Sequence, residues 1–318
     1  MYKIVLLKSP GNLNVGNEFI NVGAEYLVRK CLEQAKIKDY ELFISEFWET
    51  GNLHHKTGSS WNTKEMKAFV NQCDLVIVSA GSVNMFMQEF LHDVSQFVPP
   101  TIILGAGFYR YTQQEKELAK QAFSRARLIL CRDYVVYDAF KNDMPAVNGL
   151  DMAFFVNDAY APPFAKGNYA VLNIDIDFKR MFSRMQKYRE LKKKFERVYL
   201  TEHNSVLYAK KNFVFLSRWT EFCNLYANAA FVSTGRIHAA VICTIFHTPF
   251  EYFGKDCEPN AKRSALFRQI GMPLERGKRY TVEELKEKKA LIQQKKQEVI
   301  DALALALRQC LSSPTVRR

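Results

Sequence analysis

Arg236 and His238 stand two residues apart, where the strand-like run AAFVS gives way to an apolar run of helical length. An arginine binds phosphate or carboxylate through charge-assisted hydrogen bonds. Histidine is the side chain whose ordinary pKa suits proton transfer near pH 7. The pair therefore predicts an anion contact and a general acid at alternate positions of one extended turn, where both can face a crevice. A helix-capping arginine beside a core histidine is the structural alternative.

A Gly- and Asn-rich turn, SPGNLNVGNEF, follows the first strand-like run and contains Asn14, Gly16 and Asn17. Small residues let backbone amides approach a bound anion at the N-terminus of a helix. An ordinary strand-to-helix loop with Asn17 as the helix cap is the alternative interpretation.

Three further turns carry small or cationic residues directly after strand-like runs. Gly81 and Ser82 follow DLVIVS, Gly105 follows TIIL, and Arg132 follows RLILC. Because the carboxyl ends of parallel strands meet at one edge of a sheet, these residues are expected to line one rim of a crevice. For Arg132 and the adjacent Asp133, a surface ion pair is the alternative.

Two other patterns admit both a functional and a structural explanation. Asp175 and Asp177 form a DxD pair that could hold a metal. Alternation along a strand also places both carboxylates on one face without any metal, and we expect no metal. The segment 178–197 combines many basic residues with apolar residues at helical spacing. It is either a solvated surface helix or a helix attracted to an anionic membrane surface.

Composition limits the class of protein. The 318 residues are 48% hydrophobic and 25% charged, as in a globular protein with a sizeable core. The net charge of +12 favours anionic partners. No zinc finger, RNP1 pattern or GXXG loop is present, so nucleic acid is not the expected partner.

The expected location is the cytoplasm, including the inner face of the membrane. The sequence has no apolar run long enough to span a bilayer, and MYKIVLLKSPGN reads as a core strand rather than a signal peptide. The seven scattered cysteines predict reduced thiols, several of them core filler.

The elements that must position these residues alternate between strand-like and helix-like segments. The expected strands are 3–8, 41–45, 74–79, 101–105, 127–131, 169–174, 197–201, 212–217, 229–233 and 249–253. Residues 157–168 read as a linker, and Thr281 with Glu284 as a capping box that opens a long helix to about Cys310. We therefore predict an α/β protein with two doubly wound Rossmann-like domains, 1–160 and 161–275, and a C-terminal helix and tail, 276–318.

These motifs together resemble the polysaccharide pyruvyl transferase family. The resemblance rests on Asn14-Val15-Gly16-Asn17, on the turns VSAGSVNMF and LGAGF, on LCRDY and GLDMAF, and above all on Gly235-Arg236-Ile237-His238-Ala239, trailed by Tyr252 and Lys255. Asn17 stands where the family has an acid, and Ala80 interrupts its glycine run.

The resemblance implies a GT-B-like enzyme that transfers the enolpyruvyl unit of phosphoenolpyruvate onto two hydroxyls of a saccharide, forming a ketal in cell-surface polysaccharide biosynthesis. His238 and Arg236 would be catalytic. Donor-binding residues would be Arg132, Gly81, Ser82, Gly105 and Lys255, and acceptor-binding residues Asn14, Gly16 and Asn17. Phosphoenolpyruvate would be a co-substrate, with no cofactor, and the acceptor could be lipid-linked.

The alternatives are a GT-B glycosyltransferase that uses a nucleotide sugar and a saccharide-binding homologue without catalysis. The donor is expected in a cleft shared by the two domains, into which Arg132, Arg236 and His238 point, with the Ala161-Pro162-Pro163 segment as the hinge.

Overall fold

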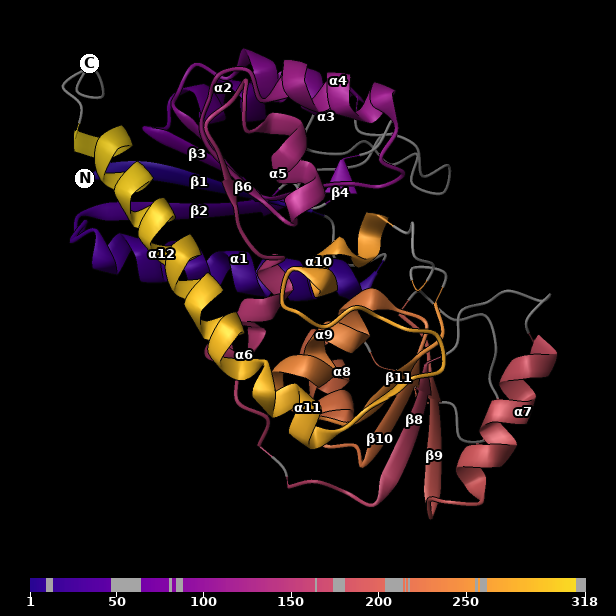
Figure 1. The fold of residues 1–318 in the computed structure, drawn as a ribbon. Coiled ribbons are helices and arrows are strands. Elements are labelled where there is room, and N and C mark those ends of the chain that lie inside the picture. The colour runs from indigo at the N-terminus through magenta and orange to yellow at the C-terminus, as the bar shows by residue number, and fades with distance from the viewer. Residues whose placement is uncertain are drawn as a thin grey trace. The chain divides into compact units, whose positions relative to one another are not determined.

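The chain divides into two compact units, and each is assembled from separated pieces of sequence. Unit 1 comprises residues 1–10, 20–155 and 293–318, and unit 2 comprises residues 11–19 and 156–292. The computed structural model describes residues 1–9, 14–46, 64–79, 82–83, 88–163, 165–173, 181–203, 214, 216, 218–254, 257 and 262–312 (Figure 1). The domain limits expected from the sequence, 160/161 and 275/276, stay predictions.

Unit 1 is built on a seven-stranded parallel sheet. Its strands are β1 (Tyr2–Lys8), β2 (Tyr40–Glu46), β3 (Leu75–Ser79), β4 (Ser82–Val83), β5 (Thr101–Phe108), β6 (Ala126–Cys131) and β7 (Ala146–Asn148). They are arranged as β2-β1-β3-β5-β6-β7, with β4 paired to β5. The winding direction changes between β1 and β3, so the unit is doubly wound, as expected.

The sequence of the central strands explains why they occupy the middle of this sheet. Every residue of β3, LVIVS, and of β5, TIILGAGF, is buried. Continuous apolar runs of this kind are typical of parallel strands covered on both faces. The helices of unit 1 are α1 (Val15–Gln34, whose first five residues are grouped with unit 2), α2 (Lys64–Asn71), α3 (Gln88–Gln96), α4 (Gln113–Ala122) and α5 (Tyr134–Phe140), with the short 3-10 helix η3 (Met152–Phe155).

Unit 2 repeats the same winding on a five-stranded sheet. Its strands are β8 (Tyr169–Asn173), β9 (Arg197–Thr201), β10 (Phe231–Thr234), β11 (Phe250–Tyr252) and β12 (Arg279–Tyr280), in the order β12-β11-β10-β8-β9. All pairs are parallel except β11 with β12. Its helices are α6 (Val156–Ala159), α7 (Met181–Lys192), α8 (Trp219–Ala227), α9 (Ile237–Ile245), η6 (Lys262–Ser264), α10 (Ala265–Arg268) and α11 (Val282–Glu287).

One expected strand, 212–217, is wrong for the residues that the structure describes. Val214 and Leu216 lie outside any strand, and the other four residues are outside the described part of the chain. Val214 N donates a hydrogen bond to Leu200 O over 2.9 Å. Val214 therefore contacts β9, the edge strand, without being part of the sheet.

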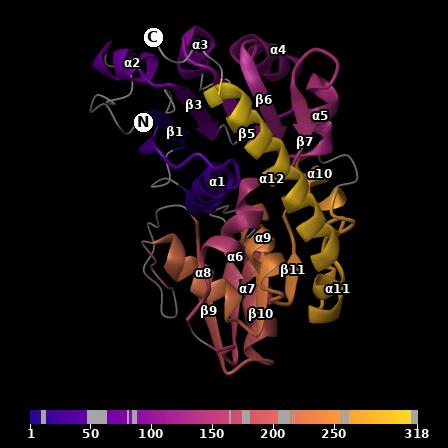
Figure 2. The ribbon, with the colours of Figure 1, turned by 90° about the vertical axis from the view of Figure 1, so that its left-hand side faces the viewer.

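The capping box near the C-terminus is confirmed, but the helix it opens is shorter than expected. The Thr281 hydroxyl accepts a hydrogen bond from Glu284 N, and Thr281 N donates to the Glu284 carboxylate. This helix, α11, ends at Glu287 with Lys288 as its C-cap, and a second helix, α12 (Lys289–Ser312), follows (Figure 2). Residues 293–312 of α12 are grouped with unit 1.

Two predictions from composition are also addressed by the structure. Six of the seven cysteines are buried, as expected of core filler. In the described part of the chain, no helix is both long enough and apolar enough to traverse a bilayer.

Candidate active site

The turn that carries Arg236 and His238 joins β10 to α9 at the carboxyl end of the second sheet. Arg236 is the N-cap residue of α9, with extended backbone angles, and its backbone N donates to Thr234 Oγ1 over 2.9 Å. Its side chain makes no capping hydrogen bond to the helix. All nine residues of α9 are buried, so the helix is fixed by apolar packing on every side.

His238 lies in the first turn of α9 rather than in an extended turn, and its side chain is 8% exposed. The expectation that Arg236 and His238 alternate along an extended segment is therefore wrong for His238. Arg236 itself is partly exposed. The structure thus places a shielded histidine beside an accessible cation at the start of a helix.

The Asn14–Gly16 turn lies against His238, although the two are far apart in the sequence. A β-carbon built on Gly16 would lie 2.6 Å from His238 Nδ1 and 3.3 Å from its Cγ. Gly16 N donates to Asn14 Oδ1 over 2.9 Å, and Asn17 N donates to Asn14 O over 2.8 Å. Asn14, not Asn17, therefore caps the start of α1, and Gly16 leaves room for the imidazole.

This contact changes where the first motif belongs. The sequence predicts Asn14, Gly16 and Asn17 on the first domain, facing the acceptor, but residues 11–19 are grouped with unit 2. An acceptor contact by these residues stays a prediction. What the structure brings together is Gly16 with His238.

A second histidine, His203, lies near the same turn. Its Nε2 is 2.8 Å from the hydroxyl of Tyr226, and its backbone O accepts a hydrogen bond from Val15 N over 3.2 Å. Burial lowers the pKa of His203 well below its ordinary value, and the neighbouring Arg236 and His238 lower it further. His203 is therefore neutral at physiological pH.

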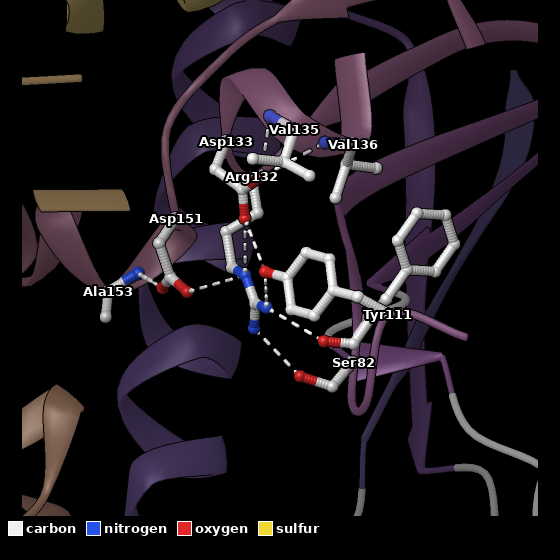
Figure 3. A network of polar contacts seen from close by, with 9 residues as sticks. Ser82, Tyr111, Arg132, Asp133, Val135, Val136, Asp151 and Ala153 are labelled. Carbon is white, nitrogen blue, oxygen red and sulfur yellow. Dashed lines mark hydrogen bonds and ion pairs between the residues drawn. The ribbon is translucent and has the colours of Figure 1, made fainter. Parts of the chain in front are cut away.

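In unit 1, Arg132 lies at the centre of a buried polar network (Figure 3). Its guanidinium donates to Ser82 Oγ over 2.8 Å, to Phe108 O over 3.3 Å and to the Tyr111 hydroxyl over 3.2 Å. Its Nε lies 3.6 Å from Asp133 Oδ2 and 4.0 Å from Asp151 Oδ2. Arg132, which directly follows β6, thus ties together residues at the carboxyl ends of β3, β5 and β7.

Local structure explains how this network is held. Asp133 caps α5 by accepting hydrogen bonds from Val135 N and Val136 N. Tyr111 has a left-handed backbone with φ of 58°, a conformation unusual for a bulky residue. Burial alone would lower the pKa of the Arg132 guanidinium, but its oxygen partners outweigh burial and raise it, so the side chain stays charged.

Arg132 is only 2% exposed. The alternative of a surface ion pair is therefore wrong, because both Arg132 and Asp133 are buried. The donor contact proposed for Arg132, and its meeting with Arg236 and His238 in one cleft, stay predictions, since these residues belong to different units.

The remaining predicted site residues divide into described and undescribed positions. Ser82, in β4, contacts Arg132. Gly105 adopts φ of 64° inside β5, within the register shift between Ile103 and Ala106, where a β-carbon would lie 3.2 Å from Met152. Gly81, Lys255 and the Asp175/Asp177 pair lie outside the described residues.

Sequence reasoning missed His203, Tyr226 and Asn173. A signal for two of them was present, because Asn173 ends β8 and His203 follows β9 by two residues, at the strand ends where ligand-facing residues gather. Tyr226 lies inside helix α8, and the sequence contained no signal for its position.

The fold defines a class: two doubly wound α/β units in tandem, the GT-B type of architecture. Sequence comparison is more specific, since the model of the family described as polysaccharide pyruvyl transferase matches residues 14–254. The chain belongs to the polysaccharide pyruvyl transferase family, and it is a transferase. No curated protein sequence matches the chain at a significant level.

Solved structures support the fold at low sequence identity. A UDP-GlcNAc 2-epimerase of Methanocaldococcus jannaschii is 13% identical, with a TM-score of 0.55, and the match covers 91% of each chain. A UDP-GlcNAc 2-epimerase of Neisseria meningitidis, bound to UDP-GlcNAc, is 10% identical, with a TM-score of 0.53, and the match covers 95% of this chain and 94% of the other. This similarity concerns the fold.

Proposed function

We propose that the protein transfers the enolpyruvyl unit of phosphoenolpyruvate onto two hydroxyls of a saccharide, forming a ketal and releasing phosphate. The observation that carries the proposal is the turn between β10 and α9. It combines a partly exposed arginine, the N-terminus of a buried helix and a shielded histidine, which together suit a small dianionic donor.

The donor would be held at Arg236. Its phosphate and carboxylate suit a guanidinium and the backbone N–H groups that open α9, because both favour negative charge. The Arg236 side chain makes no capping hydrogen bond to α9, and it is partly exposed. Asn14 would hold the neighbouring turn in place through its hydrogen bond from Gly16 N.

His238 would act as the general acid. It would donate a proton to the methylene carbon of the donor, so that carbon 2 becomes electrophilic and one acceptor hydroxyl adds there, losing its own proton to a base or water. The second hydroxyl then displaces phosphate from the same carbon and loses its proton to the departing phosphate or to water, which closes the ketal. Arg236 would stabilise the charge of the departing phosphate. No metal or cofactor takes part in these steps.

The test is phosphate release from phosphoenolpyruvate with a panel of saccharide acceptors, free and lipid-linked. Arg236→Ala is expected to weaken donor binding roughly tenfold or more, the loss of one charge-assisted contact of about 1.5–3 kcal/mol. His238→Ala is expected to lower turnover by about 10²–10⁴-fold. If both variants are folded and retain wild-type activity, the assignment of the site is wrong.

Matched controls are available in the same unit. His247 lies two residues beyond the other end of α9, and Arg197 is exposed on β9. His247→Ala and Arg197→Ala are expected to leave donor binding and turnover unchanged, so a loss in the site variants would not be a general effect of removing a histidine or a cation.

A glycosyltransferase that uses a nucleotide sugar is the second candidate. It is favoured by the structural similarity to UDP-GlcNAc 2-epimerases. Calorimetry with phosphoenolpyruvate and with UDP separates the two. Tighter binding of UDP would favour the glycosyltransferase, and saccharide binding without release of phosphate or UDP would indicate a protein without catalysis.

We also propose that the basic segment 178–197, which contains α7, associates with the cytoplasmic face of a membrane. A lipid-linked acceptor would be available to the enzyme at that surface. In α7, Met185 is 43% exposed, which gives an apolar contact among the basic residues. Lys187 is paired with Glu251 over 2.8 Å and would contribute little. Salt-sensitive co-sedimentation with anionic vesicles is expected; no binding, or binding insensitive to salt, would refute it.

A further inference from the structure

A chain of buried hydrogen bonds in unit 2 leads away from the backbone of Arg236. Arg236 N donates to Thr234 Oγ1 over 2.9 Å, and Thr234 Oγ1 donates to Asn173 Oδ1 over 3.0 Å. Asn173 Nδ2 donates to the Tyr226 hydroxyl over 3.2 Å, which lies 2.8 Å from His203 Nε2. Thr234, Asn173, Tyr226 and His203 are all buried. We call this chain the relay.

The direction of the hydrogen bonds at Asn173 and Thr234 follows from the other groups that these two side chains contact. Asn173 Nδ2 also donates to Thr201 O over 3.3 Å, and a carbonyl can only accept, so the orientation of the amide is fixed. Thr234 accepts from a backbone N–H, which leaves its own hydrogen for Asn173 Oδ1.

The tautomer of His203 follows in turn. The Tyr226 oxygen accepts from Asn173, and we assign its O–H to His203 Nε2, 2.8 Å away. In this assignment Nε2 is the acceptor, and the proton of the neutral imidazole is on Nδ1.

The relay is also connected to the N-terminal turn that lies against His238. His203 O accepts a hydrogen bond from Val15 N over 3.2 Å, and Val15 directly precedes Gly16, which lies against His238. Edge-to-face contacts with Phe19 and Phe222 hold the His203 ring. The residues before and beside His238 are thus tied to one buried framework.

Charge explains why this framework needs a neutral histidine. Arg236 and His238 both lie near His203, and an imidazolium at His203 would be repelled by the Arg236 cation. A neutral, hydrogen-bonded His203 can support the turn without competing with it for an anion. The hydroxyl of Tyr226, by occupying Nε2, favours that neutral state.

We propose that Tyr226 and His203 are positioning residues, which through the relay hold the Arg236–His238 turn in its anion-binding arrangement before the ligand arrives. This rests on the proposed function in so far as the ligand is phosphoenolpyruvate. Neither residue is expected to touch the reacting atoms.

Two substitutions break the relay at different points with little change in shape. Tyr226→Phe removes the hydroxyl between Asn173 and His203, and Thr234→Val removes the hydroxyl that holds Arg236 N. Each is expected to raise the Kd for phosphoenolpyruvate by about tenfold in calorimetry. Thr234→Ser, which restores the hydroxyl, is expected to restore the affinity.

The matched control is Thr244→Val. Thr244 is buried in α9, outside the relay, and its hydroxyl donates to Ala240 O over 2.8 Å. Thr244→Val is expected to lower Tm without changing the Kd. If it weakens binding as much as Thr234→Val does, the effect is general destabilisation and the proposal fails.

A second readout does not depend on the ligand. The ¹⁵N shifts of the His203 ring are expected to show the Nδ1–H tautomer in the wild type, and a mixture in Tyr226→Phe, with altered ring signals for His238. An Nε2–H tautomer in the wild type, or His238 signals indifferent to Tyr226→Phe, would overturn the proposal. A wild type that binds no phosphoenolpyruvate but shows the expected shifts would overturn the proposed function and leave the relay standing.

Discussion

Replacing Gly16 by alanine tests whether the N-terminal turn serves the histidine. The new methyl carbon would lie 2.6 Å from His238 Nδ1 and 3.1 Å from Asn14 Oδ1. Real β-carbons essentially never come within 3.0 Å of another heavy atom, so the imidazole must move. Because His238 lies in a helix buried along its whole length, it cannot retreat without disturbing that packing.

Two opposing terms set the size of the stability change. Gly16 lies in the first turn of α1, and glycine to alanine in a helix is worth up to about 1 kcal/mol in favour of folding. Overpacking a filled site costs about 1–3 kcal/mol. The net loss of stability is therefore expected to be no more than about 3 kcal/mol, below the roughly 5–15 kcal/mol by which native proteins are stable, so the protein stays folded.

Turnover is expected to change far more than stability. A displaced general acid costs up to about 10²–10⁴-fold in rate. Phosphate release and Tm are measured on the same preparation. The control is Gly277→Ala, where φ is 79° and no atom lies within 4 Å of the new carbon. That variant is expected to lose stability through backbone strain and to keep full turnover, the opposite pattern.

A double variant gives the sharper test. If Gly16 acts only through His238, adding Gly16→Ala to His238→Ala is expected to lower turnover no further, because the two effects are not independent. Full additivity of the two losses, or wild-type turnover in Gly16→Ala alone, would refute the reasoning.

Three further predictions concern stability. The pKa of His203 is lower in the folded protein than the unfolded value of about 6.5, so its contribution to the stability of the fold is full above that pH and is lost as the pH falls below it. Urea unfolding between pH 7.5 and 5 is expected to show a shallower loss of stability in His203→Gln than in the wild type. An equal loss in the two proteins would contradict this. Arg132→Met leaves the Asp151 and Asp133 carboxylates buried without their cation and is expected to cost about 3–5 kcal/mol in urea unfolding, far more than a surface arginine would. Thr281→Ala removes the cap of α11 and is expected to cost about 0.5–2 kcal/mol by the same measurement, with Thr281→Ser as the control that retains the cap.

The local parts of the fold were predictable because their signals are local. The strand of β3 is a short apolar run, and the Thr281–Glu284 box is a pattern of four residues. The Arg236–His238 turn was found for the same reason. A strand followed by glycine, arginine and the start of an apolar helix specifies both the turn and the end of the sheet on which it lies.

The parts that escaped prediction depend on contacts between distant residues. Nothing in the sequence around Gly16 indicates that its missing side chain makes room for His238, because that requirement arises only when the two segments pack. Tyr226 is one aromatic residue in an ordinary helix until Asn173 and His203 are placed beside it. The burial of Arg132 likewise depends on its hydrogen bonds with Ser82 and Tyr111, and no spacing in the sequence predicts those contacts.

The division of the chain into interleaved pieces has a consequence for its synthesis. Unit 1 holds α12 through contacts such as Gln34 with Asp301, at 2.8 Å, and Cys31 Sγ with Ile300 O, at 3.5 Å. These partners leave the ribosome only after residues 156–292, which takes on the order of ten seconds at ordinary rates of translation.

Through that interval the nascent first unit lacks the helix that covers part of its core, while residues 11–19 wait for partners in unit 2. Unit 1 cannot be completed before α12 is made, whereas every piece of unit 2 has been synthesised by residue 292. The first 155 residues must therefore keep their uncovered apolar surface from aggregating until α12 has emerged, and the emergence of that helix sets the earliest moment at which unit 1 can reach its native fold.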